Sequence, residues 1–355
     1  MLSRQVVVVG SGSFARSVCY GLATELRTPA DVLVLARDPA KAAEVALVAG
    51  ARAGVSGVPA TFRSAAIVLD RPDERGRVDE LLGAARPGVL IHCVSHHSPW
   101  GAPSPWTSFV GAAGFGVTLP LQTAMVLDVA ESLRRVAPEC LLINACFPDA
   151  VNAVLRGWEM PVLCGAGNIA TIAAAVRAAL PGKDLRLLAH HAHLHEPADP
   201  ADEARLWSDG VERHDVRELL APLRSASRAE LNQVGGHAAA RLVADLLAGP
   251  PAGLITHVPG PDGLPGGYPV EVTGTAVEPR LPDGLDLGDA VAWNQRMAAH
   301  DGVQVVDGQV RFPPRTAEVL RTHLPKLADG YSVRDIRVAC AELLELRDRL
   351  HADRG

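Results

Sequence analysis

The stretch VVVVGSGSFA at residues 6–15 places four valines directly before a glycine-rich turn. A β-branched run of this kind predicts a buried strand. The G-x-G-x-x-A spacing of Gly10, Gly12 and Ala15 predicts a tight turn into a helix whose N-terminus faces an anion. An ordinary glycine-rich turn is the alternative, but the position between a strand and a helix favours dinucleotide binding. The residues expected to hold the pyrophosphate through backbone groups are Gly10, Gly12, Ser13 and Phe14.

Beyond this turn, apolar β-branched runs alternate with helical patterns, the order that gives a parallel sheet covered by helices on both faces. The strands expected from these runs lie at 5–9, 31–36, 66–70, 88–94, 140–145 and 161–164. From about residue 185 the pattern changes. The elements expected there are a strand, helices near 202–221 and 227–248, strands around 268–278, and helices near 287–300 and 332–351.

The length of 355 residues predicts two domains. We expect an α/β fold with an N-terminal Rossmann-type parallel sheet, helices on both of its faces, in residues 1–165. A mixed α+β domain in residues 166–355 should follow, with the boundary lying within 155–185.

Composition narrows the classes of partner and location. Hydrophobic residues make up 48% of the chain and charged residues 21%, which predicts a globular protein. The 34 Lys and Arg against 40 Asp and Glu give a net charge of -6, so nucleic acid is not an expected partner. No apolar run approaches the ~20 residues of a membrane helix, and the N-terminus enters a strand at once, so we expect a cytoplasmic protein without membrane contact. The six scattered cysteines predict buried free thiols.

The end of the second predicted strand bears on the choice of nicotinamide cofactor. An acidic residue there would bind the ribose 2′-hydroxyl of NAD, whereas an Arg can bind the 2′-phosphate of NADP. The sequence VLVLARDPAK has Ala36 at the usual acidic position, followed by Arg37, with Lys41 four residues further on. NADP is therefore favoured, and NAD is the alternative, in which Asp38 would contact the ribose.

The segment 95–115, SHHSPWGAPSPWTSFVGAAGF, is rich in Pro and Gly and follows the end of a predicted strand. These features predict a mobile loop beside a site. Ser95 is a candidate cofactor contact. The residues His96 and His97 are candidate proton donors beside the nicotinamide, and Trp100, Trp106 and Phe109 predict a partly apolar substrate pocket.

Residues 119–155, LPLQTAMVLDVAESLRRVAPECLLINACFPDAVNAVL, resemble the lactate/malate dehydrogenase superfamily, which also includes the NAD-dependent family 4 glycosidases. In that superfamily a helix with an amide residue precedes a strand that ends in Asn, followed by Pro and Asp. The residues at similar places here are Gln122, Asn144, Pro148 and Asp149, with the Asn-to-Pro spacing two residues longer. The resemblance implies that Gln122 and Asn144 lie at the cofactor or substrate, and that the protein is a homodimer or homotetramer.

Two departures restrict the function that the resemblance implies. A lactate or malate dehydrogenase would carry an Asp and an Arg on the helix after the second Gly-x-Gly turn, where this chain has Thr171 and Ala174. Its loop after the fourth strand would also carry Arg, and SHHSPWGAPSPW has none, so a 2-hydroxy-dicarboxylate substrate is not expected. The glycosidase branch would hold a divalent metal with Cys and His around that turn, which reads GAGN here, with Cys164 preceding it.

A cluster of histidines carries the remaining chemical signal. The segment LLAHHAHLHEP resembles the strand and turn that present the superfamily's active-site His, and His191 aligns best with that residue. Imidazole can donate a proton near neutral pH, so His191 is the expected acid and His193 is the second candidate. If the stretch is a strand, His191, His193 and His195 share one face and are an alternative metal site. Structural or surface histidines are the remaining alternative.

Together these features predict an NAD(P)H-dependent oxidoreductase that transfers a hydride to or from a carbonyl or imine carbon of a small metabolite, with a His as proton donor or acceptor. NADP is the expected cofactor, and a divalent metal is not favoured. Two alternatives stay open: a metal-assisted lyase or glycosidase of the family 4 type, and a noncatalytic dinucleotide-binding sensor.

Overall fold

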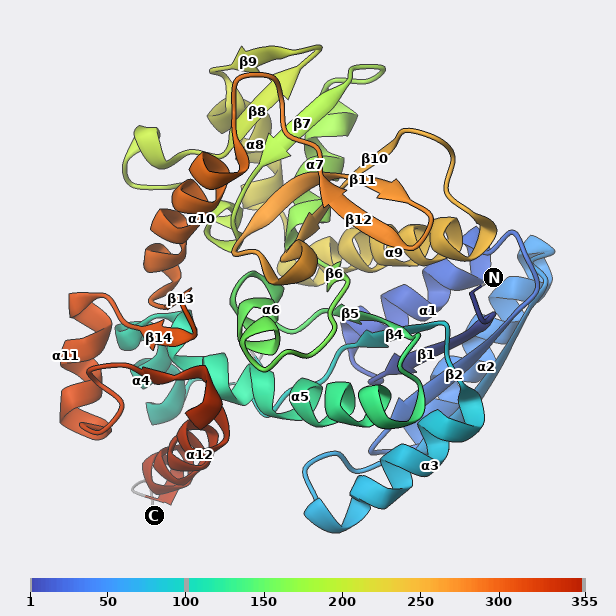
Figure 1. The fold of residues 1–355 in the computed structure, drawn as a ribbon, viewed down its shortest axis with the longest axis horizontal. Coiled ribbons are helices and arrows are strands. Elements are labelled where there is room, and N and C mark those ends of the chain that lie inside the picture. The colour runs from blue at the N-terminus through green and yellow to red at the C-terminus, as the bar shows by residue number, and fades with distance from the viewer. Residues whose placement is uncertain (1, 99–101, 353–355) are drawn as a thin grey trace.

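The computed structural model describes residues 2–98 and 102–352. Its largest element is a six-stranded sheet with the order β3-β2-β1-β4-β5-β6, in which every neighbouring pair is parallel (Figure 1). The strands of this sheet are β1 (Gln5–Val9), β2 (Ala30–Ala36), β3 (Ala60–Ala66), β4 (Val89–His92), β5 (Leu141–Asn144) and β6 (Cys164–Gly165). The predicted Rossmann-type sheet is confirmed. The strand order reverses between β1 and β4, and open parallel sheets bind ligands at such a switch point.

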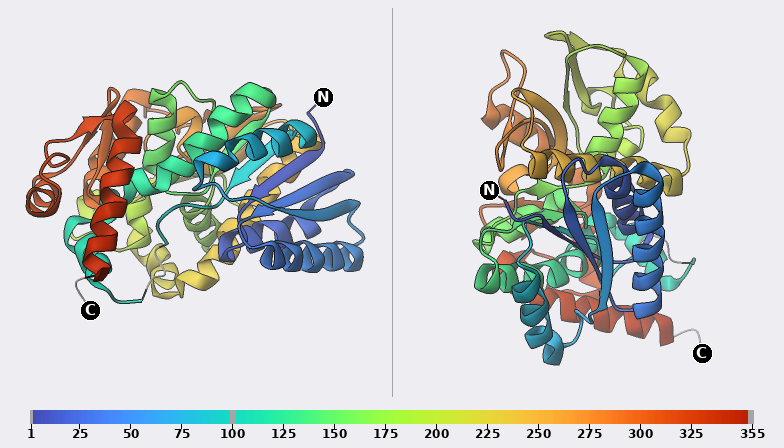
Figure 2. Two further views of the ribbon diagram at one scale, coloured as in Figure 1. Left: turned by 90° about the horizontal axis from the view of Figure 1, so that it is seen from below. Right: turned by 90° about the vertical axis from the view of Figure 1, so that its right-hand side faces the viewer.

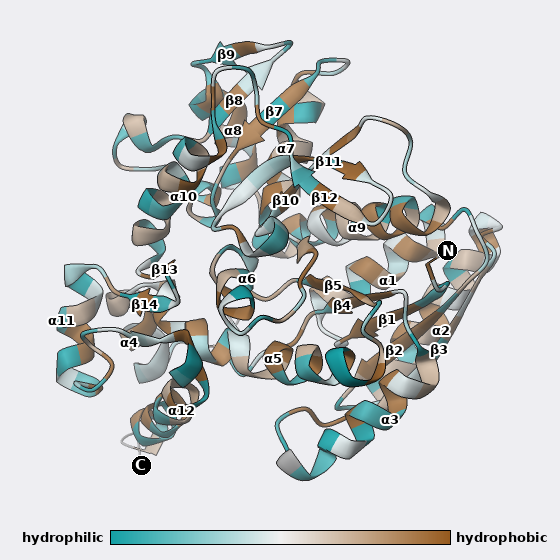
Figure 3. Ribbon diagram, in the orientation of Figure 1, coloured by the Kyte–Doolittle hydropathy of each residue, from teal (hydrophilic) through white to brown (hydrophobic). Residues whose placement is uncertain are grey.

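Alternate side chains of the central strands enter two cores, one on each face of the sheet. Val6 and Val8 of β1 pack in a core with the first two helices, whereas Val7 and Val9 pack in a core on the opposite face. The first face is covered by α1 (Ser13–Glu25) and α2 (Pro39–Ser56), and the second by α3 (Arg75–Ala85), α5 (Leu119–Val136) and α6 (Pro148–Gly157) (Figure 2). Figure 3 shows that the central strands of the sheet are mostly hydrophobic, whereas the helices that cover it mix hydrophobic and hydrophilic residues.

The second half of the chain builds three antiparallel sheets, as the mixed α+β prediction requires. Their strands are β7 (Leu185–Leu188), β8 (Arg205–Ser208), β9 (Val211–Arg213), β10 (Leu254–Pro259), β11 (Gly267–Thr273), β12 (Ala276–Pro279), β13 (Gln304–Val306), β14 (Gln309–Arg311) and β15 (Tyr331–Ser332). The helices are α7 (Asn168–Ala179), α8 (Val216–Ser225), α9 (Arg228–Ala248), α10 (Leu287–Asp301), α11 (Pro314–His323) and α12 (Ile336–Ala352). Helices predicted near 227–248, 287–300 and 332–351 are thereby confirmed.

Helix α9 joins the two halves of the chain. It packs along α1 so closely that a side chain at Gly236 would collide with Ser17, and one at Gly21 would collide with Ala240. The core on that face of the large sheet consequently includes residues from both halves, among them Val6 and Tyr268. The division at residues 165 and 166 remains a prediction, placed directly after β6.

Two predicted elements are wrong. The strand predicted at 66–70 is replaced by β3, which ends at Ala66. β3 pairs with β2 so that Ala60 lies opposite Ala30 and Ala66 lies opposite Ala36. As an edge strand it alternates in exposure, so it lacks the apolar run that marks the central strands. The helix predicted near 202–221 is replaced by the β8–β9 hairpin followed by α8. Asp209 and Gly210, both at positive φ, form the turn of that hairpin, and an Asp-Gly pair is a recognised hairpin signal.

The second part of the segment predicted as a mobile loop, from residue 102 on, contains a helix. Residues Pro105–Ala113 form α4, which begins at a capping box between Ser104 and Thr107. Trp106 and Phe109 are buried in a core with residues of α11 and α12. Trp100 lies outside the described residues. The short 3₁₀ turns of the chain are η1 (Pro72–Glu74), η2 (Phe115–Thr118), η3 (His191–Leu194), η4 (Pro200–Asp202), η5 (Pro261–Gly263) and η6 (Val333–Asp335).

All six cysteines are free, as predicted, and all of them except Cys93 are buried. Within the described ranges, no single helix has both the length and the apolar character needed to cross a membrane. The pair formed by Pro105–Ala113 and Phe115–Val136 meets that criterion together, by length and composition, but is bent by 117°.

Candidate active site

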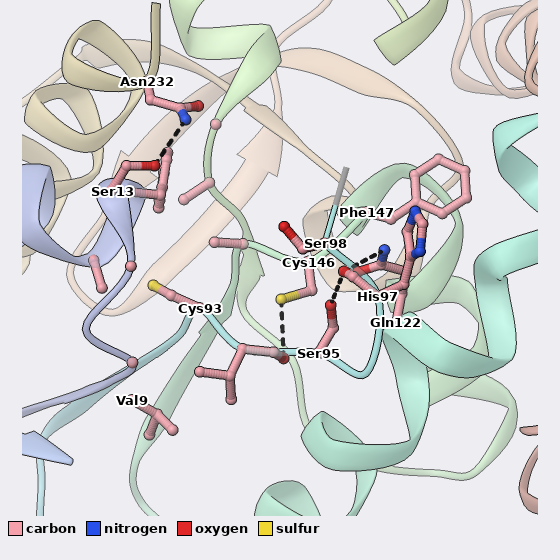
Figure 4. Close-up of a pocket in the computed structure, with 18 of the residues that line it drawn as sticks. Val9, Ser13, Cys93, Ser95, His97, Ser98, Gln122, Cys146, Phe147 and Asn232 are labelled. Atoms are coloured by element: carbon pink, nitrogen blue, oxygen red, sulfur yellow. Dashed lines mark hydrogen bonds between the residues drawn. The ribbon is translucent and has the colours of Figure 1, made fainter. Parts of the chain in front are cut away.

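A cavity of about 850 Å³ opens at the carboxyl ends of β1, β2 and β4. Its walls come from both halves of the chain: the glycine turn after β1, the ends of β2 and β4, the turn before α7, η3, the first turns of α9 and the end of α10. The position matches the switch point of the sheet, where ligands of this fold class bind. Figure 4 shows part of this wall.

The glycine turn is shaped to bring the backbone against a ligand. Gly10 has φ of 128°, and a Cβ there would lie 3.2 Å from the carbonyl oxygen of Cys93. A Cβ on Gly12 would meet nothing within 4 Å, so the backbone of Gly12 faces open space in the cavity wall. Ser13 and Phe14 also line the cavity, and Ser13 Oγ accepts a hydrogen bond of 3.2 Å from Asn232 Nδ2 of α9 (Figure 4). A pyrophosphate fits this turn.

The residues after β2 form the far end of the cavity. Arg37 is 77% exposed, and its Nη1 lies 3.8 Å from Asp70 Oδ2. Asp38 caps α2 by accepting hydrogen bonds from the backbone N–H groups of Ala40 and Lys41. These bonds hold the pKa of the Asp38 carboxyl below its usual value. Arg37 is therefore an exposed cation on the cavity wall, accessible to a ligand.

The loop after β4 is fixed by hydrogen bonds to its backbone. Ser95 Oγ donates to the carbonyl oxygen of His97 at 2.6 Å, and Gln122 Nε2 donates to the same oxygen at 3.4 Å (Figure 4). Arg347 of α12 donates to the carbonyl oxygen of His96 at 2.9 Å. Ser95 and Gln122 line the cavity as predicted, whereas His96 does not contribute to its wall.

The imidazole of His97 reaches the cavity as a neutral group. Trp106 Nε1 donates to His97 Nδ1 at 3.3 Å, so the ring proton is assigned to Nε2. Burial and then the charge of Arg347 lower the pKa of His97 to about 4. At neutral pH His97 therefore offers the cavity a hydrogen-bond donor without a charge.

The apolar wall of the cavity differs from the predicted one. Trp106 and Phe109 pack away from the cavity, and Phe115 and Phe147 join Phe14 in lining it. The rings of Phe115 and Phe147 meet edge to face with centroids 4.9 Å apart. Phe147 has φ of 44°, a left-handed conformation at the start of α6 that no sequence signal indicated. Cys93 and Cys146 line the same region, and burial raises the pKa of Cys146 to about 12, so its thiol is protonated.

His191 lies on the cavity wall with a carboxylate behind it. Its Nδ1 is 3.0 Å from Oδ2 of Asp301, and its backbone N–H donates to Asp149 Oδ1 at 3.1 Å. With Nδ1 hydrogen-bonded to the carboxylate, the ring nitrogen left for a substrate is Nε2. Phe115 stacks on the imidazole at 5.4 Å between centroids, which fixes the plane of the ring.

The electrostatics of this pair suit proton transfer. Burial lowers the pKa of His191, but the charge of Asp301 and the hydrogen bond to it outweigh burial, so the pKa lies above its usual value. Burial raises the pKa of Asp301, but the charge of His191, the hydrogen bond to it and the charges of His190 and His193 together outweigh burial and leave that pKa below its usual value. Asp301 is the last residue of α10, where a carboxylate opposes the helix dipole. Its placement is thus unfavourable to the helix and favourable to the imidazole.

Sequence reasoning missed Asp301 altogether. The resemblance led to an orienting carboxylate on α7, where Thr171 is buried and its hydroxyl donates to the carbonyl oxygen of Gly167 at 3.2 Å. Asp301 lies 110 residues from His191 in the chain. Its local sequence, an Asp before a glycine that ends a helix, is that of an ordinary helix C-terminus.

The other histidines of HHAHLH do not share one face. Residues 191–194 form the 3₁₀ turn η3 because His193 Nδ1 accepts a hydrogen bond from the backbone of His190 and His190 Nδ1 accepts one from Ala192. The condition for the alternative metal site, a strand that places His191, His193 and His195 on one face, is therefore not met. Among the described residues no group of three His, Cys, Asp or Glu side chains is placed to hold a metal ion.

The structure argues against His193, the second candidate acid. It is 1% exposed, stacks on Trp293 with the rings 5.3 Å apart, and its Nε2 donates to the carbonyl oxygen of Asp202. Burial lowers its pKa to about 4. His193 is outside the cavity wall, so it supports η3 rather than facing a ligand.

Asn144 is also corrected as a direct contact. Its side chain is fully buried at the end of β5, where Nδ2 donates to the carbonyl oxygen of Cys146 at 3.0 Å and to Oδ1 of Asn152 at 2.9 Å. Its Oδ1 accepts from the backbone N–H of Cys146. Because these contacts occupy the amide, Asn144 shapes the turn that carries Cys146 and Phe147 but is not part of the cavity wall.

Several solved structures share this fold, and they are malate and lactate dehydrogenases. The malate dehydrogenase of Picrophilus torridus in its apo form has a TM-score of 0.57 and 12% identity, covering 98% of this chain and 100% of that chain. The lactate dehydrogenase of Cryptosporidium parvum complexed with lactic acid and nicotinamide adenine dinucleotide has a TM-score of 0.55 and 13% identity, covering 96% and 99%. The malate dehydrogenase of Archaeoglobus fulgidus in complex with NADH has a TM-score of 0.52 and 13% identity, covering 83% of this chain and 96% of that chain.

No protein-family model matches the sequence, and no curated protein is significantly similar to it. These comparisons show a shared fold. The chain has the fold of malate and lactate dehydrogenases, at low sequence identity to them. The resemblance drawn from residues 119–155 is confirmed at this level.

Proposed function

We propose that this chain is an NAD(P)H-dependent oxidoreductase acting on a carbonyl or imine carbon of a small metabolite, or on the corresponding alcohol or amine. The observation that carries the proposal is the His191–Asp301 pair, 3.0 Å apart, on the wall of the cavity that also contains the glycine turn. One cavity thus joins a pyrophosphate-binding turn to an oriented proton donor, the two parts that hydride transfer requires.

The cofactor fits the residues present. Backbone groups of Gly10, Gly12, Ser13 and Phe14 would hold its pyrophosphate, and Ser95 and Gln122 line the same cavity. Solved neighbours with this fold carry NADH or NAD in complex. When bound, the nicotinamide supplies or accepts the hydride.

The protein's own chemistry lies at His191 Nε2. As a carbonyl is reduced, its oxygen gains the electron pair of the C=O π bond and takes the proton from Nε2, leaving a neutral imidazole. In the opposite direction Nε2 takes the hydroxyl proton. Asp301 holds Nδ1 and stabilises the charged ring, while His97 offers an uncharged Nε2–H donor to the same space. The aromatic wall of Phe115 and Phe147 limits water beside the reacting carbon.

The test of this proposal has two parts. NADPH and NADH are titrated into the protein by fluorescence, and turnover is then followed by nicotinamide absorbance with a panel of 2-oxo acids, ketones, aldehydes and imines. Binding and turnover are expected. Tight binding with no turnover across the panel would favour the sensor alternative, and absence of binding would contradict both.

The glycosidase alternative receives no support from the side chains. That mechanism needs a divalent metal held by Cys and His, and Cys164 is fully buried in β6 with its pKa raised to about 12 by burial. The residues therefore do not fit the group, and we derive no step through a metal.

Arg37→Ala is expected to weaken NADPH binding more than NADH binding. We keep NADP(H) as the proposed cofactor because Ala36 and Arg37 lie where a 2′-phosphate would be recognised. A charge-assisted contact contributes about 1.5–3 kcal/mol, and the exposure of Arg37 places it at the lower end, roughly a tenfold loss. Fluorescence titration of both cofactors measures it, with Arg52→Ala, an exposed α2 residue outside the cavity, as the control. Equal losses for NADPH and NADH would refute the 2′-phosphate role.

Asp301→Asn is expected to shift the pH profile of reduction toward acid. Reduction needs His191 protonated, so its rate falls as the pH rises through the pKa of His191. The charge of Asp301 raises that pKa, and its removal lowers it, so the fall should occur at lower pH in the variant. The measurement is kcat/KM against pH. An unshifted profile with a reduced rate at every pH would assign Asp301 a structural role alone.

A further inference from the structure

Arg228 is a half-buried cation on the cavity wall that has no carboxylate partner among the described residues. It begins α9, and its Nη2 contacts the carbonyl oxygen of Leu194 at 3.3 Å and Nε2 of His195 at 3.0 Å. The other cations of the cavity are paired. These are the Arg and Lys side chains of the wall, Arg37 and Lys41, each of which lies 3.8 Å from an aspartate.

The contacts of Arg228 tie it to the catalytic turn. Leu194 is the last residue of η3, the turn that carries His191, and His195 directly follows that turn. Because guanidinium groups only donate, His195 Nε2 must accept this hydrogen bond, which requires a neutral imidazole. Burial and the charge of Arg228 both lower the pKa of His195, in agreement with that role. The positive charge of Arg228 also opposes protonation of His191, so it acts at the end of the cavity where the proton is transferred.

An unpaired guanidinium in this position is energetically unfavourable until an anion reaches it. A carbonyl and a neutral imidazole satisfy one nitrogen of the side chain and leave its charge uncompensated. Burial lowers the pKa of Arg228, which reports the same cost. A planar oxyanion that accepts two hydrogen bonds from the guanidinium would offset the cost, because charge-assisted, bidentate pairs are the strong ones.

We propose that Arg228 binds an oxyanion of the substrate, a carboxylate or a phosphate, and so sets the substrate class of the cavity as an anion joined to an apolar body. The apolar part would lie against Phe115 and Phe147, and the carbonyl or alcohol would lie at His191. The inference rests on the proposed function, and it places anion recognition on α9 rather than on α7, where Thr171 and Ala174 bear no charge.

Four probes test the assignment: phenylacetate, phenyl phosphate, their neutral counterpart phenylacetamide, and NADPH. Calorimetry measures the binding of each phenyl compound to the cofactor-free and to the NADPH-loaded protein. The wild type is expected to bind at least one anion more tightly than phenylacetamide, and the stronger of the two identifies carboxylate or phosphate. Arg228→Gln should weaken anion binding by about 10–100-fold, leaving phenylacetamide and NADPH unchanged. Arg228→Lys keeps the charge but loses the planar guanidinium. Its affinity for the anions should lie between that of the wild type and that of Arg228→Gln.

Arg241→Gln is the matched control, since Arg241 lies on the same helix, is paired with Glu25, and is not on the cavity wall. It should bind every probe as the wild type does. Equal anion affinity in the wild type and in folded Arg228→Gln would overturn the proposal, as would a wild type with no preference for anions. A loss of NADPH affinity with unchanged anion binding would also overturn it and assign Arg228 to the cofactor pyrophosphate. Failure of the wild type to bind NADPH would instead reject the proposed function, and the cofactor-free titrations would still report on Arg228.

Discussion

His191→Asn is expected to bind NADPH with unchanged affinity and to turn over substrate about 10²–10⁴-fold more slowly, the range for losing general acid catalysis. The amide of Asn retains a polar group near Asp301 but has no group that releases a proton near neutral pH. His191 is not a residue of the glycine turn, so its substitution is expected to leave the contacts of that turn with the cofactor intact. Binding and chemistry should therefore separate in this variant.

The measurement is single-turnover oxidation of NADPH with the substrate that the carbonyl and imine panel identifies. His214→Asn makes the same change at an exposed histidine outside the cavity and should keep the full rate. His193→Asn removes a buried ring that stacks on Trp293, so it should lower stability while leaving the rate per folded molecule close to that of the wild type. A full rate in His191→Asn would remove His191 as the acid, and a selective loss in His193→Asn would transfer that role two residues along the chain.

The predictable parts of the fold are the elements that local sequence patterns determine. The valines before Gly10 and the run from Val32 to Ala36 are apolar because β1 and β2 lie inside the sheet with cores on both faces. An edge strand such as β3 has no such requirement, and its pattern was missed. The hairpin at Asp209 and Gly210 did carry a local signal, but the apolar and polar residues around it also fit a helix.

The candidate site likewise contains residues that local sequence indicates and residues that only the fold brings together. The glycine turn and His191 belong to segments whose spacing is visible in the chain, whereas Asp301 and Arg228 reach the cavity only because α10 and α9 fold back onto η3. The sequence motifs also did not distinguish polar residues that face the cavity from polar residues that only support the structure. Asn144 and His193 satisfy their hydrogen-bonding groups within the protein, and nothing in their sequence positions shows that.

Gly12→Asp is expected to lower NADPH affinity by at least about 100-fold, since a carboxylate would stand against the pyrophosphate and like charges in contact cost several kcal/mol. The same substitution should leave the fold intact. Gly12 has φ of -73°, which any residue adopts, and a Cβ there meets no atom within 4 Å. Gly10 differs, because its φ of 128° and its contact with Cys93 would strain any side chain. The loss in Gly12→Asp is therefore a loss of binding and not of structure.

Gly76→Asp is the matched control, because a Cβ there also meets nothing within 4 Å and the residue is exposed on α3, away from the cavity. It should bind NADPH as the wild type does. Gly12→Ala separates bulk from charge: a methyl group in the open space over the turn should weaken binding much less than the carboxylate. Circular dichroism verifies that each variant is folded. Should folded Gly12→Asp bind NADPH with wild-type affinity, the turn between β1 and α1 does not hold a dinucleotide, and the oxidoreductase proposal loses its cofactor site even if His191 proves essential.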